Sequence, residues 1–255
     1  AIYPEVFPIR NTDKPPIPLK YRLGYFCIDN YAPVSRNAIT AAREAVDCAV
    51  TGAAHIVGDD DLAYALVRPP GHHAEAGFLG GFCYLNSAAV ATEYLSDYGR
   101  TAVLDIDFHH GNGTQSIFYH RPDVLTVSIH GDPRYAFPHF AGFQSETGEG
   151  RGRGFNVNIP LPEQIEAADY MAALTRALGR IQRFRPEYLV ISLGLDTARA
   201  DPTGTWPLRA GDFEMIGRQI GALKRPTLIV QEGGYRTRTL GVNARRFFLG
   251  LWETH

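Results

Sequence analysis

The segment TAVLDIDFHHGNG (residues 101–113) contains an apolar run that leads directly into two aspartates and two histidines. The run over residues 101–107 has the continuous apolar character of a strand that is buried on both faces, which is typical of parallel sheets. In open parallel sheets, ligands bind beyond the carboxyl ends of the strands. The segment therefore predicts a central strand and a functional site that directly follows it.

Further apolar runs alternate with helical patterns on both sides of this segment. Strands are predicted at 63–67, 123–130, 156–159, 188–194 and 227–234. Helices are predicted at 38–50, ending before Gly52, and at 87–98, 165–184, 212–223 (capped by Asp212) and 241–251, with a long loop at 131–154. This alternation predicts an α/β fold: one domain with a mostly parallel central sheet flanked by helices on both faces.

The composition limits the class of protein. A chain of 255 residues with 45% hydrophobic residues can bury the core of one large domain. The net charge of −2 gives no basic field for nucleic acid and is compatible with a cationic substrate. No apolar run reaches the length of about 18 residues expected of a membrane span, and the three cysteines form no CxxC pair. We expect no nucleic-acid or membrane partner and a reducing, cytoplasmic location.

The first 20 residues contain five prolines, which disfavour both a helix and a central strand. We interpret residues 1–20 as an arm that precedes a catalytic domain over residues 21–255. The arm can be a surface loop or linker, or an ordered element of a subunit contact, and the proline content does not decide between them.

Polar side chains of matching chemistry follow several of the predicted strands. His72 and His73 come after the first strand, Asp196 comes after the fifth, and Tyr235 follows two glycines after the last. Because the carboxyl ends of parallel strands lie at one edge of a sheet, we expect these side chains to meet the Asp-His pair of the opening segment. Their agreement with one topological rule carries more weight than any single motif.

Asp107 and His109 are two positions apart, so on an extended strand their side chains point the same way. Together with Asp196 they form an O/N/O set that suits Zn²⁺, Fe²⁺ or Co²⁺ better than Ca²⁺. Three protein ligands leave room for water and a substrate carbonyl, which is typical of a catalytic site. The alternative is that Asp107 only caps a turn and that His109 is a hydrogen-bonded core histidine.

The tandem histidines are candidates for general acid–base catalysis. Buried imidazoles need hydrogen-bond partners, and Asp105 is placed to accept a bond from one of them. The pair His72 and His73 would then provide base and acid, unless one histidine only supports the other. The phenol of Tyr235 can donate to a developing oxyanion, although a tyrosine in a simple turn is the alternative.

Four segments together resemble the arginase-related zinc deacetylases, which belong to the histone deacetylase superfamily: RPPGHHAEAGFLGGFCYLNSAAVA, LDIDFHHGNGTQSIFY, SLGLDTARADP and QEGGY. Within this group the chain is most similar to bacterial acetylpolyamine amidohydrolases, through IYPEVFPIRNTDKPPIP, LGYFCIDNYAPVS and SIHGDPRYAFPHFAGFQSETGEG. The resemblance implies the arginase/deacetylase fold, removal of acetyl groups from small N-acetylated amines, and a homodimer formed with the arm. It also implies that an N-terminal portion with the first strand is missing, so we expect a fragment.

The resemblance assigns roles to individual residues. It makes Asp107, His109 and Asp196 the zinc ligands, His73 the general base, His72 its partner bonded to Asp105, and Tyr235 the oxyanion donor. The implied substrate tunnel consists of Phe82, Phe137, Gly81 and Gly233, of which the two phenylalanines can also be ordinary core residues. The implied K⁺ sites consist of Asp105, Asp107, His109, Ser128 and Ile129, and of Phe118 and Val124.

Asn112 stands where some relatives have aspartate, so the pKa of His73 should be lower than in those proteins. Asp29, Asp132 and Glu146 are candidates for attracting a cationic amine at the pocket mouth, or are simply solvated surface charges.

Three other functions remain open. They are deacetylation of acetyl-lysine in proteins, non-catalytic binding of acylated ligands, and an arginase-like ureohydrolase with two Mn²⁺ ions, against which the tandem histidines and the Gly-Gly-Tyr sequence argue.

Overall fold

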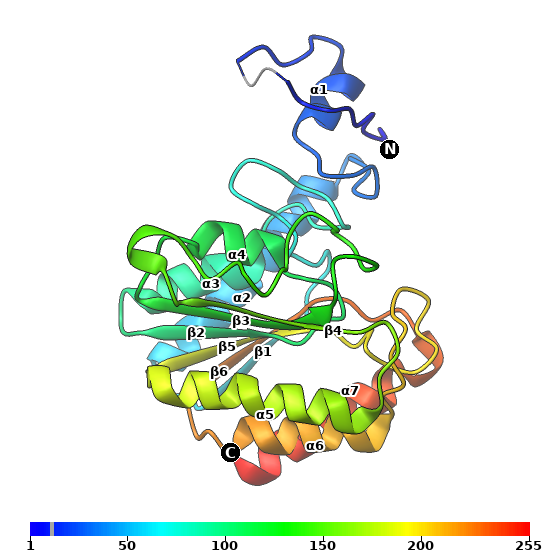
Figure 1. Ribbon diagram of the computed structural model, residues 1–255. Coiled ribbons are helices and arrows are strands. Elements are labelled where there is room, and N and C mark those ends of the chain that lie inside the picture. Colours follow the sequence, from blue (N-terminus) through cyan, green and yellow to red (C-terminus); the bar gives the residue numbers. More distant parts are fainter. Residues whose placement is uncertain (11–12) are drawn as a thin grey trace.

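A computed structural model describes residues 1–10 and 13–255. Its single sheet has six strands in the order β1-β6-β5-β2-β3-β4, and all neighbouring strands are parallel (Figure 1). The strands are β1 Leu62–Ala65, β2 Thr101–Asp105, β3 Val124–Gly131, β4 Asn156–Leu161, β5 Tyr188–Leu193 and β6 Thr227–Gln231. The predicted parallel α/β fold is confirmed, and β2, which begins the opening segment, lies inside the sheet between β5 and β3.

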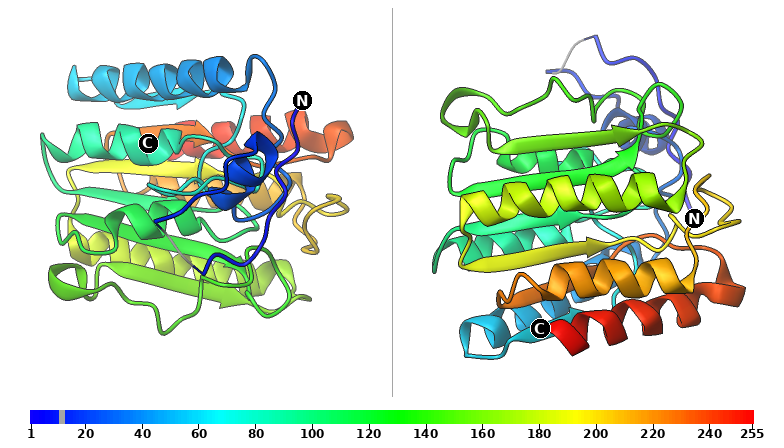
Figure 2. Two further views of the ribbon diagram at one scale, coloured as in Figure 1. Left: turned by 90° about the horizontal axis from the view of Figure 1, so that it is seen from above. Right: turned by 60° about the horizontal axis from the view of Figure 1, so that its bottom comes forward.

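Helices cover both faces of the sheet. One face carries α2 (Ala38–Val57), α3 (Ser87–Ser96) and α4 (Asn112–Phe118). The other carries α5 (Ala167–Phe184), α6 (Ala210–Gly221) and α7 (Thr237–Thr254), which lie side by side in Figure 2 (right). A short 3-10 helix, η1, spans Gly150–Gly152 within the long loop after β3. None of the helices in the described part of the chain is both long enough and apolar enough to span a bilayer.

The two faces of the sheet form two apolar clusters. In β5, Leu189 and Ile191 pack into the cluster under α5, α6 and α7, whereas Val190 between them packs into the cluster under α2 and α3. Side chains alternate between faces along a strand, so a strand covered on both sides must be apolar at every position. This requirement explains the uninterrupted apolar runs from which the sheet was predicted.

Three local predictions are wrong. Helix α2 does not stop near Gly52 but continues to Val57, because Gly52 faces the sheet, where a Cβ atom would lie 2.7 Å from Cδ1 of Leu228. The predicted start at Asp212 is wrong, since α6 begins at Ala210, but Asp212 does cap the helix: its carboxylate accepts a hydrogen bond of 2.8 Å from the amide of the N-cap residue Arg209. Strand β2 ends at Asp105, so the residues that follow lie in a loop.

The N-terminal segment and helix α1 (Leu19–Tyr25) stand apart from the layered part of the molecule in Figure 1. An isolated antiparallel bridge joins Ile2 to Val34, and the Glu5 amide donates to the carbonyl of Lys20. The predicted arm over residues 1–20 therefore includes the first two residues of α1, and its residues 11 and 12 lie outside the described residues. Its role in a subunit contact stays a prediction.

Candidate active site

A pocket of about 300 Å³ lies at the carboxyl ends of the strands. It is lined by Tyr31, Pro70, His72, His73, Gly81, Phe82, Asp107, His109, Phe137, Thr203, Gly233 and Tyr235. These residues come from the segments that follow β1, β2, β3, β5 and β6, together with one residue from the N-terminal region. The structure thus brings the predicted strand ends to one cavity.

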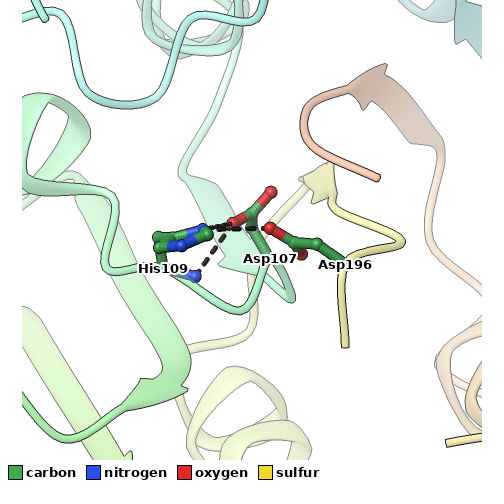
Figure 3. Close-up of side chains that lie close together, drawn as sticks. All are labelled: Asp107, His109 and Asp196. Atoms are coloured by element: carbon green, nitrogen blue, oxygen red, sulfur yellow. Dashed lines mark hydrogen bonds and ion pairs between the residues drawn. The ribbon is translucent and has the colours of Figure 1, made fainter. Parts of the chain in front are cut away.

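Asp107, His109 and Asp196 point toward one another (Figure 3), and the first two of them line this pocket. Their potential ligand atoms all lie within 4.8 Å of one another. Nδ1 of His109 is 3.1 Å from Oδ1 of Asp107 and 2.9 Å from Oδ2 of Asp196. Asp107 and His109 lie in the loop after β2, which ends at Asp105. The turn of this loop brings their side chains together, whereas the sequence predicts that they share one face of an extended strand.

Backbone amides hold the outer oxygens of both carboxylates. The Gly233 amide donates to Oδ2 of Asp107 at 2.9 Å, and the Phe108 amide donates to Oδ1 of Asp196 at 2.8 Å. Gly233 also leaves space here, since a Cβ atom at this position would lie 2.6 Å from Oδ2 of Asp107 and 2.8 Å from Oδ2 of Asp196. Two backbone amides therefore orient the carboxylates of the ligand set, and the missing side chain of Gly233 leaves free space beside them.

The electrostatics of this set fit a bound cation. Asp107 and Asp196 are 1% and 0% exposed. Burial and the neighbouring Asp107 raise the pKa of Asp196 to about 7. Burial lowers the pKa of His109, but hydrogen bonds with the two aspartates outweigh this effect and raise the pKa to about 10. Two buried carboxylates stay charged at low cost only beside positive charge, and one imidazole with two carboxylates is a ligand set of Zn²⁺-type ions.

The tandem histidines have different partners. Nδ1 of His72 is 2.9 Å from Oδ2 of Asp105, and Nδ1 of His73 is 2.8 Å from Oδ1 of Asn112. The Asn112 amide nitrogen donates to Oε1 of Glu75 at 2.7 Å, which fixes the orientation of the amide. Its oxygen can only accept, so Nδ1 of His73 carries a hydrogen.

The two histidines therefore hold protons to different degrees. Burial, followed by the neighbouring His72, lowers the pKa of His73 well below its usual value. Although burial also disfavours its charge, Asp105 and Asp107 raise the pKa of His72 well above that value. A neutral His73 with Nδ1 protonated leaves Nε2 as a proton acceptor, which is the property that a general base requires.

The phenylalanine and glycine residues predicted for the tunnel line the pocket, and so does Tyr235, the predicted oxyanion donor. Phe137 contacts His73 with ring centroids 4.9 Å apart, and Phe82 contacts Tyr235 at 5.7 Å. Phe82 is 41% exposed, so it is not an ordinary core residue. Burial raises the pKa of Tyr235, which keeps the phenol protonated and able to donate a hydrogen bond.

Replacing Gly81 by alanine should disable this pocket. Gly81 has φ +53°, and a Cβ atom would collide with Cδ2 of His73 and lie 3.0 Å from Cε1 of Phe137. The displaced imidazole should lower kcat on the order of 10²-fold, since small misplacements at reacting groups have effects of this size. Gly77→Ala is the matched control from the same loop, because no other atom lies within 4 Å of the place its methyl group would take. Equal activity of the two variants would contradict the prediction.

Glu232 is a buried acid at the site whose role no sequence pattern indicates. Its Oε2 accepts hydrogen bonds from the Gly71 amide at 2.7 Å and the His72 amide at 3.1 Å. Burial raises the pKa of Glu232 to about 7. The residue thus joins the end of β6 to the loop that carries both histidines, a contact between positions 160 residues apart.

Glu232→Ala should lower the free energy of unfolding by about 2–4 kcal/mol, because two buried amides lose their acceptor. Glu232→Gln keeps an acceptor oxygen of the same shape and should change it by about 1 kcal/mol or less. Urea unfolding of both variants measures the difference. Losses of equal size would show that the carboxylate does not act through these two bonds.

The structure places the remaining predicted residues as follows. Asp105, at the end of β2, is the register partner of Ser128 within β3, and Ile129 follows Ser128 in that strand. Phe118 and Val124 pack in the apolar cluster under α2 and α3. These positions are compatible with the predicted K⁺ sites, which stay predictions.

Two of the three acids predicted near the mouth lie elsewhere. Asp132 pairs with Arg134, and Glu146 accepts a bond from the Gly142 amide at 2.8 Å within a polar network under the long loop. Neither residue lines the pocket. Only Asp29 adjoins it, since its carboxylate accepts bonds from the amides of Gly81 at 2.7 Å and Tyr31 at 2.8 Å.

Hydrolysis of an acyl group by water is favoured by a cation site, a neutral base and a hydrogen-bond donor for the oxyanion, and this site offers all of these groups at the carboxyl edge of a parallel sheet. The geometry thus points to a hydrolase of the deacetylase class. Comparison with known proteins agrees: the chain belongs to the histone deacetylase domain family, whose model matches residues 10–251.

Its relatives include bacterial enzymes that are named acetylpolyamine amidohydrolases. Acetylpolyamine amidohydrolase 1 of Pseudomonas aeruginosa is 44% identical over 233 residues, which cover 90% of this chain and 67% of that protein. The acetylpolyamine amidohydrolase of Burkholderia pseudomallei is 48% identical over 224 residues, covering 88% and 66%. A crystal structure of acetylpolyamine aminohydrolase from Burkholderia pseudomallei matches with a TM-score of 0.94 at 43% identity, covering 98% of this chain and 72% of that one. The chain thus spans 66–72% of these relatives' length.

Proposed function

We propose that the chain is a zinc-dependent amidohydrolase that removes acetyl groups from small N-acetylated amines, and from acetylpolyamines above all. The observation that carries this proposal is that the cluster of Asp107, His109 and Asp196 opens through its first two members into the pocket that a neutral His73 also lines. Fe²⁺ or Co²⁺ would suit the same ligand set. The names of the relatives support the substrate class.

The reaction consumes one water and releases acetate and a free amine. Asp107, His109 and Asp196 would hold the ion, which when bound supplies Lewis-acid chemistry and favours ionisation of water. Nε2 of His73 accepts the proton of the attacking water and later delivers it to the leaving amine nitrogen. The Tyr235 hydroxyl donates to the acetyl oxygen as negative charge develops there.

His72 contacts His73 and influences its protonation. Its bond to Asp105 orients the imidazole and stabilises its positive charge. The rings of His72 and His73 lie 4.0 Å apart, so the charge on the first disfavours a second charge on the other. The pair therefore divides into a charged member and a neutral member, which is the division that acid–base catalysis near neutral pH uses.

The pocket suits a slim substrate. Tyr31, Phe82 and Phe137 give it apolar walls, which can contact a methylene chain. Asp29 lies next to the mouth and provides negative charge for a distal ammonium group.

We also propose a homodimer that uses exposed apolar side chains of the arm region, namely Ile2, Tyr3, Val6, Ile17 and Leu19. In addition, we propose that the protein binds K⁺ as a second cation.

Side-by-side turnover of acetylputrescine and an acetyl-lysine peptide by the zinc-loaded protein tests this proposal. We expect a higher kcat/KM for acetylputrescine. Turnover of the peptide alone would favour the protein deacetylase instead. Absence of turnover with both substrates would favour a non-catalytic binding protein, and two metal ions per chain would favour a ureohydrolase.

A further inference from the structure

Asp201 is a buried acid beside the pocket that has no part in the mechanism above. It follows β5 in the segment SLGLDTARADP and is 5% exposed. Its carboxylate accepts four hydrogen bonds, and all four donors are uncharged. A buried carboxylate must be stabilised by hydrogen bonds, because it has lost its contact with water. The four bonds therefore hold the carboxylate in one specific position.

The four bonds join two segments of the pocket wall. Oδ2 accepts from the amides of Tyr235 at 2.7 Å and Arg236 at 2.8 Å. Oδ1 accepts from the amide of Thr203 at 3.0 Å and from its hydroxyl at 2.9 Å. Thr203 and Tyr235 both line the pocket, so Asp201 connects the loop after β5 with the loop after β6.

Little else determines where the phenol lies. Within residues 1–10 and 13–255, the Tyr235 hydroxyl has no hydrogen-bond partner. Its ring contacts Phe82 with centroids 5.7 Å apart, and Phe82 is itself 41% exposed. The preceding Gly234 has φ +131°, a conformation that other residues rarely adopt. Among the described residues, the Tyr235 main chain makes a local bond from the Thr237 amide to its carbonyl at 2.9 Å, and its bond to Asp201 is the polar contact that ties it to another segment.

We propose that Asp201 is a positioning residue that places the Tyr235 hydroxyl over the acetyl oxygen, with Thr203 completing its contacts. This inference rests on the proposed deacetylase function. Asp201 does not touch the substrate and acts only through the main chain of Tyr235. Its loss should therefore lower kcat and not the affinity of the site for metal.

Asp201→Asn is the sharpest variant. An amide has one acceptor oxygen and one NH₂ donor, so in either orientation its NH₂ group faces N–H or O–H donors. We expect kcat to fall about 10–100-fold, with unchanged metal content. Thr203→Val keeps the carboxylate and should have a smaller effect, below about tenfold. Asp212→Asn is the matched control, because its carboxylate accepts a backbone amide bond in α6, away from the pocket.

A double-mutant cycle with Tyr235→Phe separates positioning from general stability. If Asp201 acts through the phenol, Asp201→Asn should lower kcat less than about threefold in the Tyr235→Phe background. An equal fall in both backgrounds, or an unchanged kcat of Asp201→Asn, would overturn the proposal.

A crystal structure of Asp201→Asn provides a readout that does not depend on turnover. We expect the main chain of Tyr235 to move by about 1 Å or more, and an unmoved Tyr235 would overturn the proposal. If the unmodified protein hydrolyses no acetylated amine, the proposed function fails, and this structure still decides whether Asp201 positions the tyrosine. If Asp201→Asn does not fold, Asp201→Glu, which keeps the charge but displaces the carboxylate, takes its place in the cycle and in the crystal structure.

Discussion

Asp196→Asn should remove the bound ion and lower kcat/KM by about 10³-fold or more, since the ion supplies several kcal/mol of transition-state stabilisation. Asp196 is fully buried, and its Oδ2 lies 2.9 Å from Nδ1 of His109. An amide is nearly the same shape and can keep the bond from the Phe108 amide. The variant therefore changes the charge of the ligand set with little change in packing.

Metal content per chain and turnover of acetylputrescine check this result together. We expect the metal content to fall from one ion per chain toward zero as activity is lost. Asp169→Asn is a suitable control, because this exposed carboxylate accepts only the Glu166 amide at the start of α5. Full metal content and full activity in Asp196→Asn would contradict the assignment of this residue.

Tyr235→Phe should lower kcat by about 10²–10³-fold, which is the effect of removing one donor from an oxyanion site. The variant keeps the aromatic ring and its contact with Phe82. Because the hydroxyl has no hydrogen-bond partner within residues 1–10 and 13–255, the free energy of unfolding should be nearly unchanged. KM and metal content should also stay close to those of the unmodified protein.

Steady-state kinetics and urea unfolding of this variant separate a chemical role from a structural one. Tyr119→Phe is the matched control, since Tyr119 follows α4 and does not line the pocket. A raised KM with an unchanged kcat would indicate that Tyr235 binds the substrate in the ground state and does not stabilise the oxyanion.

The sheet could be predicted from sequence because its physical signal is local. A strand covered on both faces must be apolar throughout, as in Leu189, Val190 and Ile191 of β5. The placement of His72 and Tyr235 in one pocket followed from a rule about strand ends, which needs only the order of the elements. Helix α4 was missed, since its seven residues, NGTQSIF, show little helical periodicity.

Contacts between distant segments could not be predicted in this way. Glu232 accepts bonds from amides 160 and 161 positions away, and Asp201 accepts from amides 34 and 35 positions away. A backbone amide carries no residue identity, so no sequence pattern reveals which acid it will meet. For the same reason Glu146 could not be assigned to the network under the long loop from its charge alone.

Anomalous diffraction from crystals of the zinc-loaded protein tests the central claim most directly. The account predicts a single strong zinc peak per chain, bonded at about 2 Å to Asp107, His109 and Asp196. A peak elsewhere in the molecule, or two metal ions bridged by these side chains, would contradict it.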